Sequence, residues 1–178
     1  GLDWHDEASM IRVAQRLEIR FHVAEEINRV VVGEVDVTEA IRRPAISRGA
    51  SIVSALPGVR AALLSLQRDY ASANDVIAEG RDTGTVVFPR AETKFFLTAT
   101  PEVRALRRYR ELAGAGIEID LESVRVEMEE RDQRDSNREV APLVPATDAI
   151  FVDSTSMNLE QVVTTMLDHI PAALRTDL

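Results

Sequence analysis

Cysteine is absent from the 178 residues, so the chain can form no disulfide and offers no thiolate as a nucleophile or metal ligand. Lysine is almost absent as well, because Lys94 is the single exception among 21 basic residues. No apolar run approaches the roughly 18 residues of a membrane-spanning helix, and no secretory signal pattern is evident. A net charge of −9 disfavours a broad basic surface for nucleic acid. These absences predict a cytoplasmic protein with neither membrane nor nucleic-acid partners.

The hydrophobic pattern indicates one α/β domain. Apolar residues make up 45% of the chain, enough for the core of a single domain over residues 1–178. Short apolar runs at 75–78, 93–97 and 149–152 are predicted as strands, and helical patterns separate them. Continuous apolar strands of this length are typical of a parallel sheet covered on both faces, which places the chain in the α/β class.

The first half of the chain predicts helices and a small antiparallel hairpin. A helix is expected over 8–17, and strands over 18–23 and 29–32 with Asn28 in the turn between them. Thr38 is expected to cap a short helix, and the pattern over 45–70 predicts two helices that meet near Pro57.

Helix-start signals are clearer in the second half. Thr100 and Pro101 predict the start of a helix over 102–112, which glycines at 114 and 116 end. A long polar helix is expected over 121–138, and Asn158 with Gln161 has capping-box spacing before a helix over 162–170. Ligands of open α/β sheets bind beyond the carboxyl ends of the strands, which points to Arg81–Asp82, 98–100 and 153–155.

Arginine and aspartate recur at helical spacing in the predicted helix over 121–138. Arg131 and Asp135 are one turn apart and Arg138 follows three residues later, so we expect the three on one face. That face is either a solvent-exposed one with ordinary ion pairs, or a site whose arginines hold a phosphate while Asp135 accepts from ribose hydroxyls. Spacing alone leaves both interpretations open.

Two other groups carry similar alternatives. The run Gly80-Arg81-Asp82-Thr83-Gly84 is either an ordinary turn after a strand or a turn that lets a ligand approach the backbone closely. Arg104, Arg107 and Arg108 share one face of the predicted helix over 102–112. They form either an exposed basic face or a group that reaches a transferring phosphate.

Several kinds of site are excluded by what the sequence does not contain. The three histidines are scattered without metal-ligand spacing, and no Gly-x-Ser-x-Gly nucleophile motif occurs. No glycine precedes a lysine, and Lys94 lies within a predicted strand, so the Gly-x-x-x-x-Gly-Lys phosphate-binding loop is not found. We therefore predict no metal site built from protein side chains.

Two longer segments resemble those of bacterial cytidylate kinases. They are residues 77–89 and Arg131-Asp132-x-x-Asp135-x-x-Arg138-x-x-Ala141-Pro142-Leu143, with shorter matches at 51–60 and 153–155. The resemblance covers residues 8–170 and implies the nucleoside monophosphate kinase fold, which is related to the P-loop NTPases. That fold has a parallel sheet wrapped by helices, a small antiparallel substrate-binding insert and a lid, here near residues 17–37 and 104–117.

The resemblance also implies a reaction and its residues. ATP would transfer its γ-phosphate to CMP or dCMP in a monomeric enzyme, with Mg²⁺ carried by ATP. The residues implied for the monophosphate are Ser51, Arg60 and Asp82 for cytosine, Arg81 and Arg138 for its phosphate, and Arg131 with Asp135 for ribose. The residues implied for ATP and the moving phosphoryl group are Arg104, Arg107 and Arg108.

The family's N-terminal strand and its Gly-x-x-x-x-Gly-Lys loop have no counterpart in the 178 residues. We therefore expect a partial cytidylate kinase domain that is inactive by itself. Two alternatives are a non-catalytic CMP-binding module and a kinase for another monophosphate such as UMP or AMP. Asp82 and Arg60 argue against the second, because their acceptor and donor groups suit the edge of cytosine.

Overall fold

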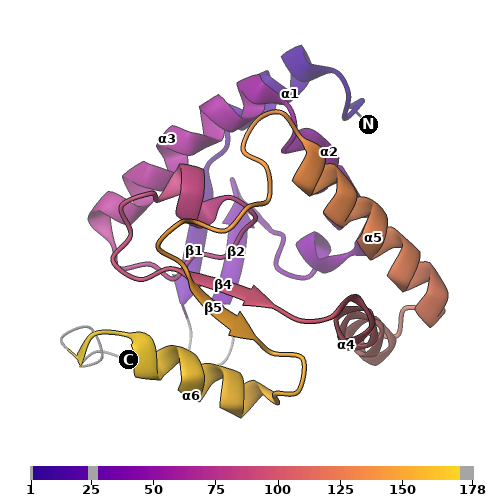
Figure 1. Cartoon of the computed structure of the whole chain (residues 1–178). Coiled ribbons are helices and arrows are strands. Elements are labelled where there is room, and N and C mark those ends of the chain that lie inside the picture. Colours follow the sequence, from indigo (N-terminus) through magenta and orange to yellow (C-terminus); the bar gives the residue numbers. More distant parts are fainter. Residues whose placement is uncertain (1, 24–27, 173–178) are drawn as a thin grey trace. The chain divides into compact units, whose positions relative to one another are not determined.

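The computed structural model of the chain describes residues 2–23 and 28–172. They divide into two compact units at Ile77–Ala78, and each unit has its own sheet (Figure 1). The first unit carries an antiparallel sheet and the second a parallel pair of strands between helices. The α/β class is therefore confirmed.

Short helices flank the hairpin sheet of the first unit. Its elements, in chain order, are α1 (Glu7–Ala14), β1 (Ile19–Val23), β2 (Asn28–Val32), β3 (Val35–Asp36), the 3-10 helix η1 (Ala40–Arg42), α2 (Pro44–Val53) and α3 (Pro57–Ala73). The predicted break at Pro57 is confirmed, because proline there begins α3 at a position where its missing N–H costs nothing.

The core of the first unit lies between α1 and α3. Met10 and Ala14 of α1 bury against Val59 of α3. A Cβ at Gly58 would lie 2.3 Å from Ile11 Cδ1, so the two helices approach closely there and the Ile11 side chain would have to move if Gly58 were replaced. The Gly58 N–H donates to Glu7 Oε1 at 2.9 Å, which ties the start of α3 to the start of α1.

The predicted hairpin is confirmed as β1 and β2 in antiparallel register, and β3 extends it. Two details were wrong. Asn28 is not a turn residue but pairs with Val23 as the first residue of β2, and the turn itself lies outside the described residues. Thr38 does not cap η1; its Oγ1 instead accepts from the Val30 N–H at 2.9 Å, so it serves the sheet.

The second unit alternates strands with longer helices. Its elements are the single π-type turn η2 (Thr83–Val87), β4 (Phe95–Thr98), α4 (Pro101–Gly114), α5 (Leu121–Asn137), β5 (Ile150–Asp153) and α6 (Leu159–His169). The predicted caps are confirmed, because Thr100 accepts from Val103 and Asn158 and Gln161 form a capping box. Buried Ala105, Leu112 and Val124 join α4 to α5.

β4 and β5 run parallel with Phe95 opposite Ile150 and Thr98 opposite Asp153. Their carboxyl ends therefore lie side by side, as predicted. The strand predicted over 75–78 was wrong, since this apolar segment is irregular and Ile77 is 89% exposed. A strand needs a neighbour to complete its hydrogen bonds, and 75–78 has none among the described residues. Lys94 lies one residue before β4 rather than inside it.

No helix within residues 2–23 and 28–172 is by itself long and apolar enough to cross a membrane. Among the described helices, only the pair α2 and α3 taken together reaches that length, and it is bent by 103° at the break between them.

Candidate functional site

The carboxyl ends of β4 and β5 are joined by hydrogen bonds. The Ser154 N–H donates to the Thr98 carbonyl at 2.8 Å, and the Thr100 N–H donates to Thr155 Oγ1 at 3.0 Å. Asp153 accepts from both the N–H and the hydroxyl of Thr155, and these bonds lower the pKa of Asp153. The turn after β5 is therefore fixed against the start of α4.

An arginine–carboxylate cluster lies in the second unit, and we use this name for Arg81, Asp82, Arg131, Asp135 and Arg138. Asp135 is at its centre, with a side chain only 3% exposed. Its Oδ2 accepts from Arg81 Nε at 3.1 Å, although 54 residues separate the two in sequence. Asp82 lies 3.3 Å from Arg138 Nη2 in a second buried pair.

Arg131 completes the cluster without a good hydrogen bond at its Nε. That nitrogen is buried and lies 3.6 Å from Asp135 Oδ2, beyond hydrogen-bond distance, and it has no other partner among the described residues. Burial, and then the like charge of Arg81, lower the pKa of Arg131. The Arg131 side chain as a whole is 37% exposed, and its guanidinium lies beside that of Arg81, an arrangement suited to bind an anionic ligand.

Arg138 ends α5 and does not continue its face. Its backbone is extended, so the expectation that Arg131, Asp135 and Arg138 share one helical face was wrong for Arg138. The chain turns sharply instead, with Ala141 at a φ of 52° and its carbonyl accepting from Arg138 Nε. The Leu143 N–H donates to the Asp135 carbonyl at 2.8 Å, which closes the turn onto the last turn of α5.

The α4 arginines, Arg104, Arg107 and Arg108, have separate partners. Arg104 Nη1 lies 2.5 Å from Asp132 of α5, and its Nε donates to the Ala99 carbonyl at 3.2 Å. Arg107 donates to Ser154 Oγ at 2.8 Å and to the Ser154 carbonyl at 2.6 Å. Arg108 pairs with Glu111 at 2.8 Å. Arg104 thus links the end of β4 to the helix that carries the cluster.

The two remaining candidate residues belong to the first unit and lie at the corner between α2 and α3. Ser51 is buried on α2, and Arg60 of α3 donates from Nη1 to the Ser54 carbonyl at 3.1 Å. The Ser54 hydroxyl in turn donates to the Ser51 carbonyl at 3.2 Å. This corner therefore holds Ser51 and Arg60 near one another.

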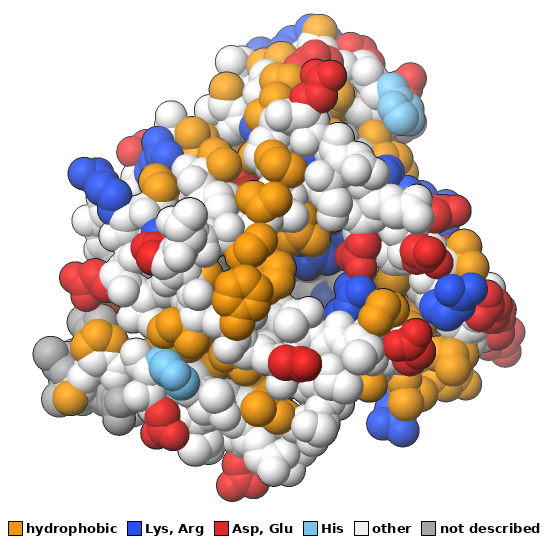
Figure 2. Space-filling model, viewed as in Figure 1, with side chains coloured by type: hydrophobic (Ala, Val, Ile, Leu, Met, Phe, Trp, Pro, Cys, Tyr) orange, Lys and Arg blue, Asp and Glu red, His pale blue; other side chains and the backbone are white. Residues whose placement is uncertain are grey.

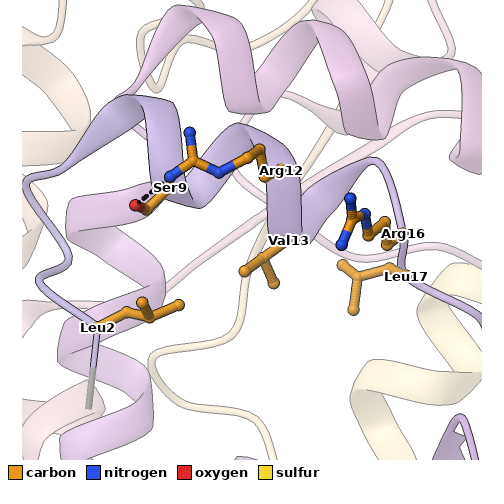
Figure 3. A pocket seen from close by; sticks show the side chains of 6 residues that line it. All are labelled: Leu2, Ser9, Arg12, Val13, Arg16 and Leu17. Carbon is orange, nitrogen blue, oxygen red and sulfur yellow. Dashed lines mark hydrogen bonds between the residues drawn. The ribbon is translucent and has the colours of Figure 1, made fainter.

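A hollow of about 390 Å³ lies beside α1 in the first unit (Figure 3). Apolar Leu2, Val13 and Leu17 line it with Arg12 and Arg16, and Arg12 donates to Ser9 Oγ at 2.7 Å. None of the candidate residues named above lines it. The hollow is therefore separate from the cluster residues and the α4 arginines in its lining.

Residues that could hold a metal were also sought. Within the described part of the chain, no three histidine, aspartate or glutamate side chains are grouped as metal ligands. The described residues therefore do not form a magnesium site by themselves.

On the face seen in Figure 2, basic and acidic side chains are interspersed rather than separated into fields of one sign.

Two structurally important residues were missed from the sequence. Asp132 was quoted in a motif without a role, and it pairs with Arg104. Lys94 is predicted from the sequence as a residue inside a strand with no functional role, whereas its side chain is buried and paired. The one available signal for Lys94 was its rarity in an arginine-rich chain.

Arginines held by buried carboxylates, linked to the carboxyl ends of parallel strands, define an α/β protein suited to phosphorylated ligands. A sequence model of the cytidylate kinase family matches residues 1–172. The chain belongs to that family. It is 46% identical over 171 residues to a cytidylate kinase of Pseudomonas paraeruginosa, covering 95% of this chain and 75% of that relative. It is 48% identical over 164 residues to one of Aeromonas hydrophila, covering 92% and 71%.

Proposed function

We propose that the chain serves the transfer of the ATP γ-phosphate to CMP or dCMP, giving CDP or dCDP. The observation that carries this proposal is the arginine–carboxylate cluster, in which two buried carboxylates orient three arginines. Phosphoryl transfer needs little covalent chemistry from the protein, so positioning and charge stabilisation are the main tasks. Family membership supplies the nucleotide class that the cluster alone does not specify.

For the monophosphate, the proposed roles follow charge and hydrogen-bond capacity. Arg81 and Arg138 hold the CMP phosphate through guanidinium forks. Asp82 accepts from the exocyclic amine of cytosine, and Arg131 with Asp135 binds the ribose. From the family resemblance, Ser51 and Arg60 are proposed as further cytosine contacts. The partly exposed guanidinium of Arg131, whose Nε has no hydrogen-bond partner among the described residues, supports a ligand oxygen in this cluster.

For the donor, the α4 arginines neutralise charge on ATP and on the moving phosphoryl group. Arg104 and Arg108 now pair with Asp132 and Glu111, partners that phosphate oxygens would replace. The guanidinium of Arg107 donates hydrogen bonds to Ser154 and to the Met157 carbonyl, so a contact with ATP requires that these bonds be exchanged for bonds to phosphate. This helix and the residues to 117 are proposed as the lid, and 17–37 as the substrate-binding insert.

Magnesium would be carried by the ATP phosphates and would neutralise part of their charge, and the described residues contain no group of three metal-ligating side chains. We further propose that the enzyme is a monomer of the cytoplasm that binds no nucleic acid. The absence of cysteine supports a reducing compartment, and the net charge of −9 argues against a broad basic surface.

Asp82→Ala tests the proposal. Loss of a hydrogen bond to a charged group costs about 1.5–3 kcal/mol, so CMP affinity should fall by roughly ten- to a hundredfold. ATP affinity should be unchanged, because Asp82 is assigned to the base of the acceptor alone. Calorimetry measures both affinities, and steady-state kinetics of the full-length gene product measures turnover.

Asp69→Ala is the matched control, because Asp69 is an exposed carboxylate of α3 without a proposed role. Equal losses of CMP and ATP affinity in Asp82→Ala would contradict the role of that residue. Tight CMP binding without ADP formation by the full-length product would instead support a binding module. A preference for UMP over CMP would support the other alternative.

A further inference from the structure

Lys94 is the only lysine of the chain, and it is buried. Its side chain is 7% exposed, and its Nζ donates to the Pro89 carbonyl at 2.6 Å. The same Nζ lies 2.7 and 3.0 Å from the two carboxylate oxygens of Asp148. A buried ammonium is costly unless it is paired and hydrogen-bonded, and here both conditions are met. We refer to Lys94, Pro89 and Asp148 as the lysine bridge.

On one side, the lysine bridge closes the segment that begins with Arg81 and Asp82. The Asp82 carbonyl accepts from the N–H groups of Thr85, Val86 and Val87, which gathers η2 into one compact turn. A Cβ at Gly84 would lie 3.4 Å from Lys94 Cδ, so the lysine stem packs directly under this turn. Pro89, two residues after η2, is then held by Nζ.

On the other side, Asp148 belongs to the connection that leaves the cluster for β5. That connection starts at Asp135 and Arg138 and is tied back by the bond from Leu143 to the Asp135 carbonyl. It ends at Asp148, and β5 begins two residues later at Ile150. Two segments, 81–89 and 135–148, are thus connected at both ends. The pairs Arg81–Asp135 and Asp82–Arg138 join their first residues, and Lys94 joins their last residues, Pro89 and Asp148.

We infer that Lys94 is a positioning residue for recognition of the CMP base, acting through Asp82. This inference rests on the proposed function of the cluster. With the bridge intact, the Asp82 carboxylate and its pair with Arg138 belong to a closed ring of contacts that also includes η2, Lys94 and Asp148. Without it, the segment from Asp82 to Pro89 loses the side-chain contact that holds Pro89, while β4 stays paired with β5. The Asp82 carboxylate is then oriented less firmly toward the exocyclic amine.

The bridge requires the shape of lysine. A compact ammonium on a narrow stem can reach one carbonyl and one carboxylate together, whereas a planar guanidinium is wider and orients its donors in a fixed fork. Lys94→Arg is therefore not expected to rescue the function. Lys94→Met keeps the stem under η2 and removes only the charge and the donors, which makes it the informative change.

The experiment measures CMP and UMP binding to the 178-residue chain by calorimetry. Lys94→Met should weaken CMP by about tenfold, the effect of losing one charged hydrogen-bond contact, and should change UMP much less. The affinity ratio of CMP to UMP therefore falls, which a general loss of stability would not produce. Arg125→Met, at an exposed ion-paired arginine of α5, is the control and should leave the ratio unchanged.

The absence of cysteine permits a chemical rescue. Lys94→Cys, unfolded, aminoethylated at that single thiol and refolded, regains an ammonium at nearly the lysine length. Recovery of the CMP-to-UMP ratio on aminoethylation supports the inference. Recovery of the melting temperature without recovery of the ratio would overturn it, because the lysine would then serve stability alone.

Asp148→Asn is the second variant, should Lys94→Met fail to fold. It keeps the shape of the partner and weakens the bridge, so the ratio should fall by a smaller factor. A folded Asp148→Asn chain with an unchanged ratio would overturn the inference. If the unsubstituted chain binds no CMP at all, the proposed function fails instead, and the two failures are thus distinguished.

Discussion

The arginine–carboxylate cluster and the α4 arginines use the same functional group in different surroundings. In the cluster, the side chains of Asp135 and Asp82 are only 3% and 12% exposed. On α4, the partner carboxylates of Arg104 and Arg108 are 26% and 59% exposed. The carboxylates of the cluster are thus withdrawn from water, although Arg81 and Arg131 remain 39% and 37% exposed, whereas the partner carboxylates on the α4 side are accessible to water.

This difference separates two tasks. A buried carboxylate cannot lose its arginine cheaply, so the cluster keeps one geometry and presents it to whatever binds. A solvent-accessible ion pair contributes little and exchanges its partner readily. The cluster therefore suits recognition of the acceptor nucleotide, and α4 suits charge that develops during transfer.

Asp135→Ala should have the largest effect, because it leaves Arg81 and Arg131 as like charges without their shared partner. Breaking a buried pair costs about 3–5 kcal/mol, so both thermal stability and CMP turnover should drop steeply. The ratio of CMP to dCMP use should also shift, since Asp135 is assigned to the ribose. Denaturant unfolding of the chain and steady-state kinetics of the full-length gene product measure these effects. Near-normal values for both would show that this helix face is an ordinary solvent-exposed one.

Arg104→Ala should have the next largest effect, and it should act on kcat. Removing one donor that stabilises transition-state charge costs about a hundredfold in kcat, with the KM for CMP unchanged. Arg125→Ala provides the control, as it removes an exposed arginine of α5 that takes no part in the proposed site. A rise in KM for CMP with normal kcat would show that Arg104 binds the acceptor nucleotide, as proposed for the cluster, and does not stabilise charge in the transition state.

Arg138→Lys should cause a moderate loss. The guanidinium of Arg138 bonds the Ala141 carbonyl and Asp82 together, and an ammonium cannot copy both directions. A loss of about 1.5 kcal/mol, or roughly tenfold in CMP affinity, is expected. Calorimetry with CMP and ATP measures it, and unchanged CMP affinity would show that charge alone suffices at this position.

Acid should produce the smallest effect, at the turn that anchors α4. Hydrogen bonds from Thr155 lower the pKa of Asp153 below its usual value of 3.8. A lowered pKa in the folded chain means that these bonds stabilise above pH 3.8 and are lost as the pH falls through the lowered value. Amide exchange of Thr155 should therefore lose protection in acid, and Asp153→Asn should remove that dependence. Equal acid sensitivity of both chains would exclude this carboxylate as the cause.

Local signals in the sequence were enough to predict many of the helices. Thr100 with Pro101 and Asn158 with Gln161 satisfy helix N-termini within a few residues of themselves, so no tertiary information is needed. The segment 75–78 shows the opposite case. Its apolar pattern is that of a strand, but a strand is completed by a neighbour, and the sequence pattern does not state whether one is present.

The candidate site was predictable in composition and not in pairing. Helical spacing placed Arg131 beside Asp135, and the structure agrees. The partner of Arg138 is Asp82, 56 residues away, which no spacing rule gives. The sequence also predicts Lys94 inside a strand, whereas it lies one residue before β4. Its burial and its bond to Asp148 could not be predicted, because both depend on the fold.

Ala141 has a strained backbone conformation at the turn that orients the Arg138 guanidinium. Its φ of 52° is one that residues with a Cβ rarely adopt, and the left-handed conformation is unfavourable by roughly 1 kcal/mol for such a residue. Glycine would relieve that strain, yet it would also free the peptide whose carbonyl holds Arg138 Nε. Alanine is therefore strained at this position, but it keeps the turn stiffer than glycine would. That stiffness fixes the peptide plane of Ala141, whose carbonyl sets the direction of the Arg138 guanidinium.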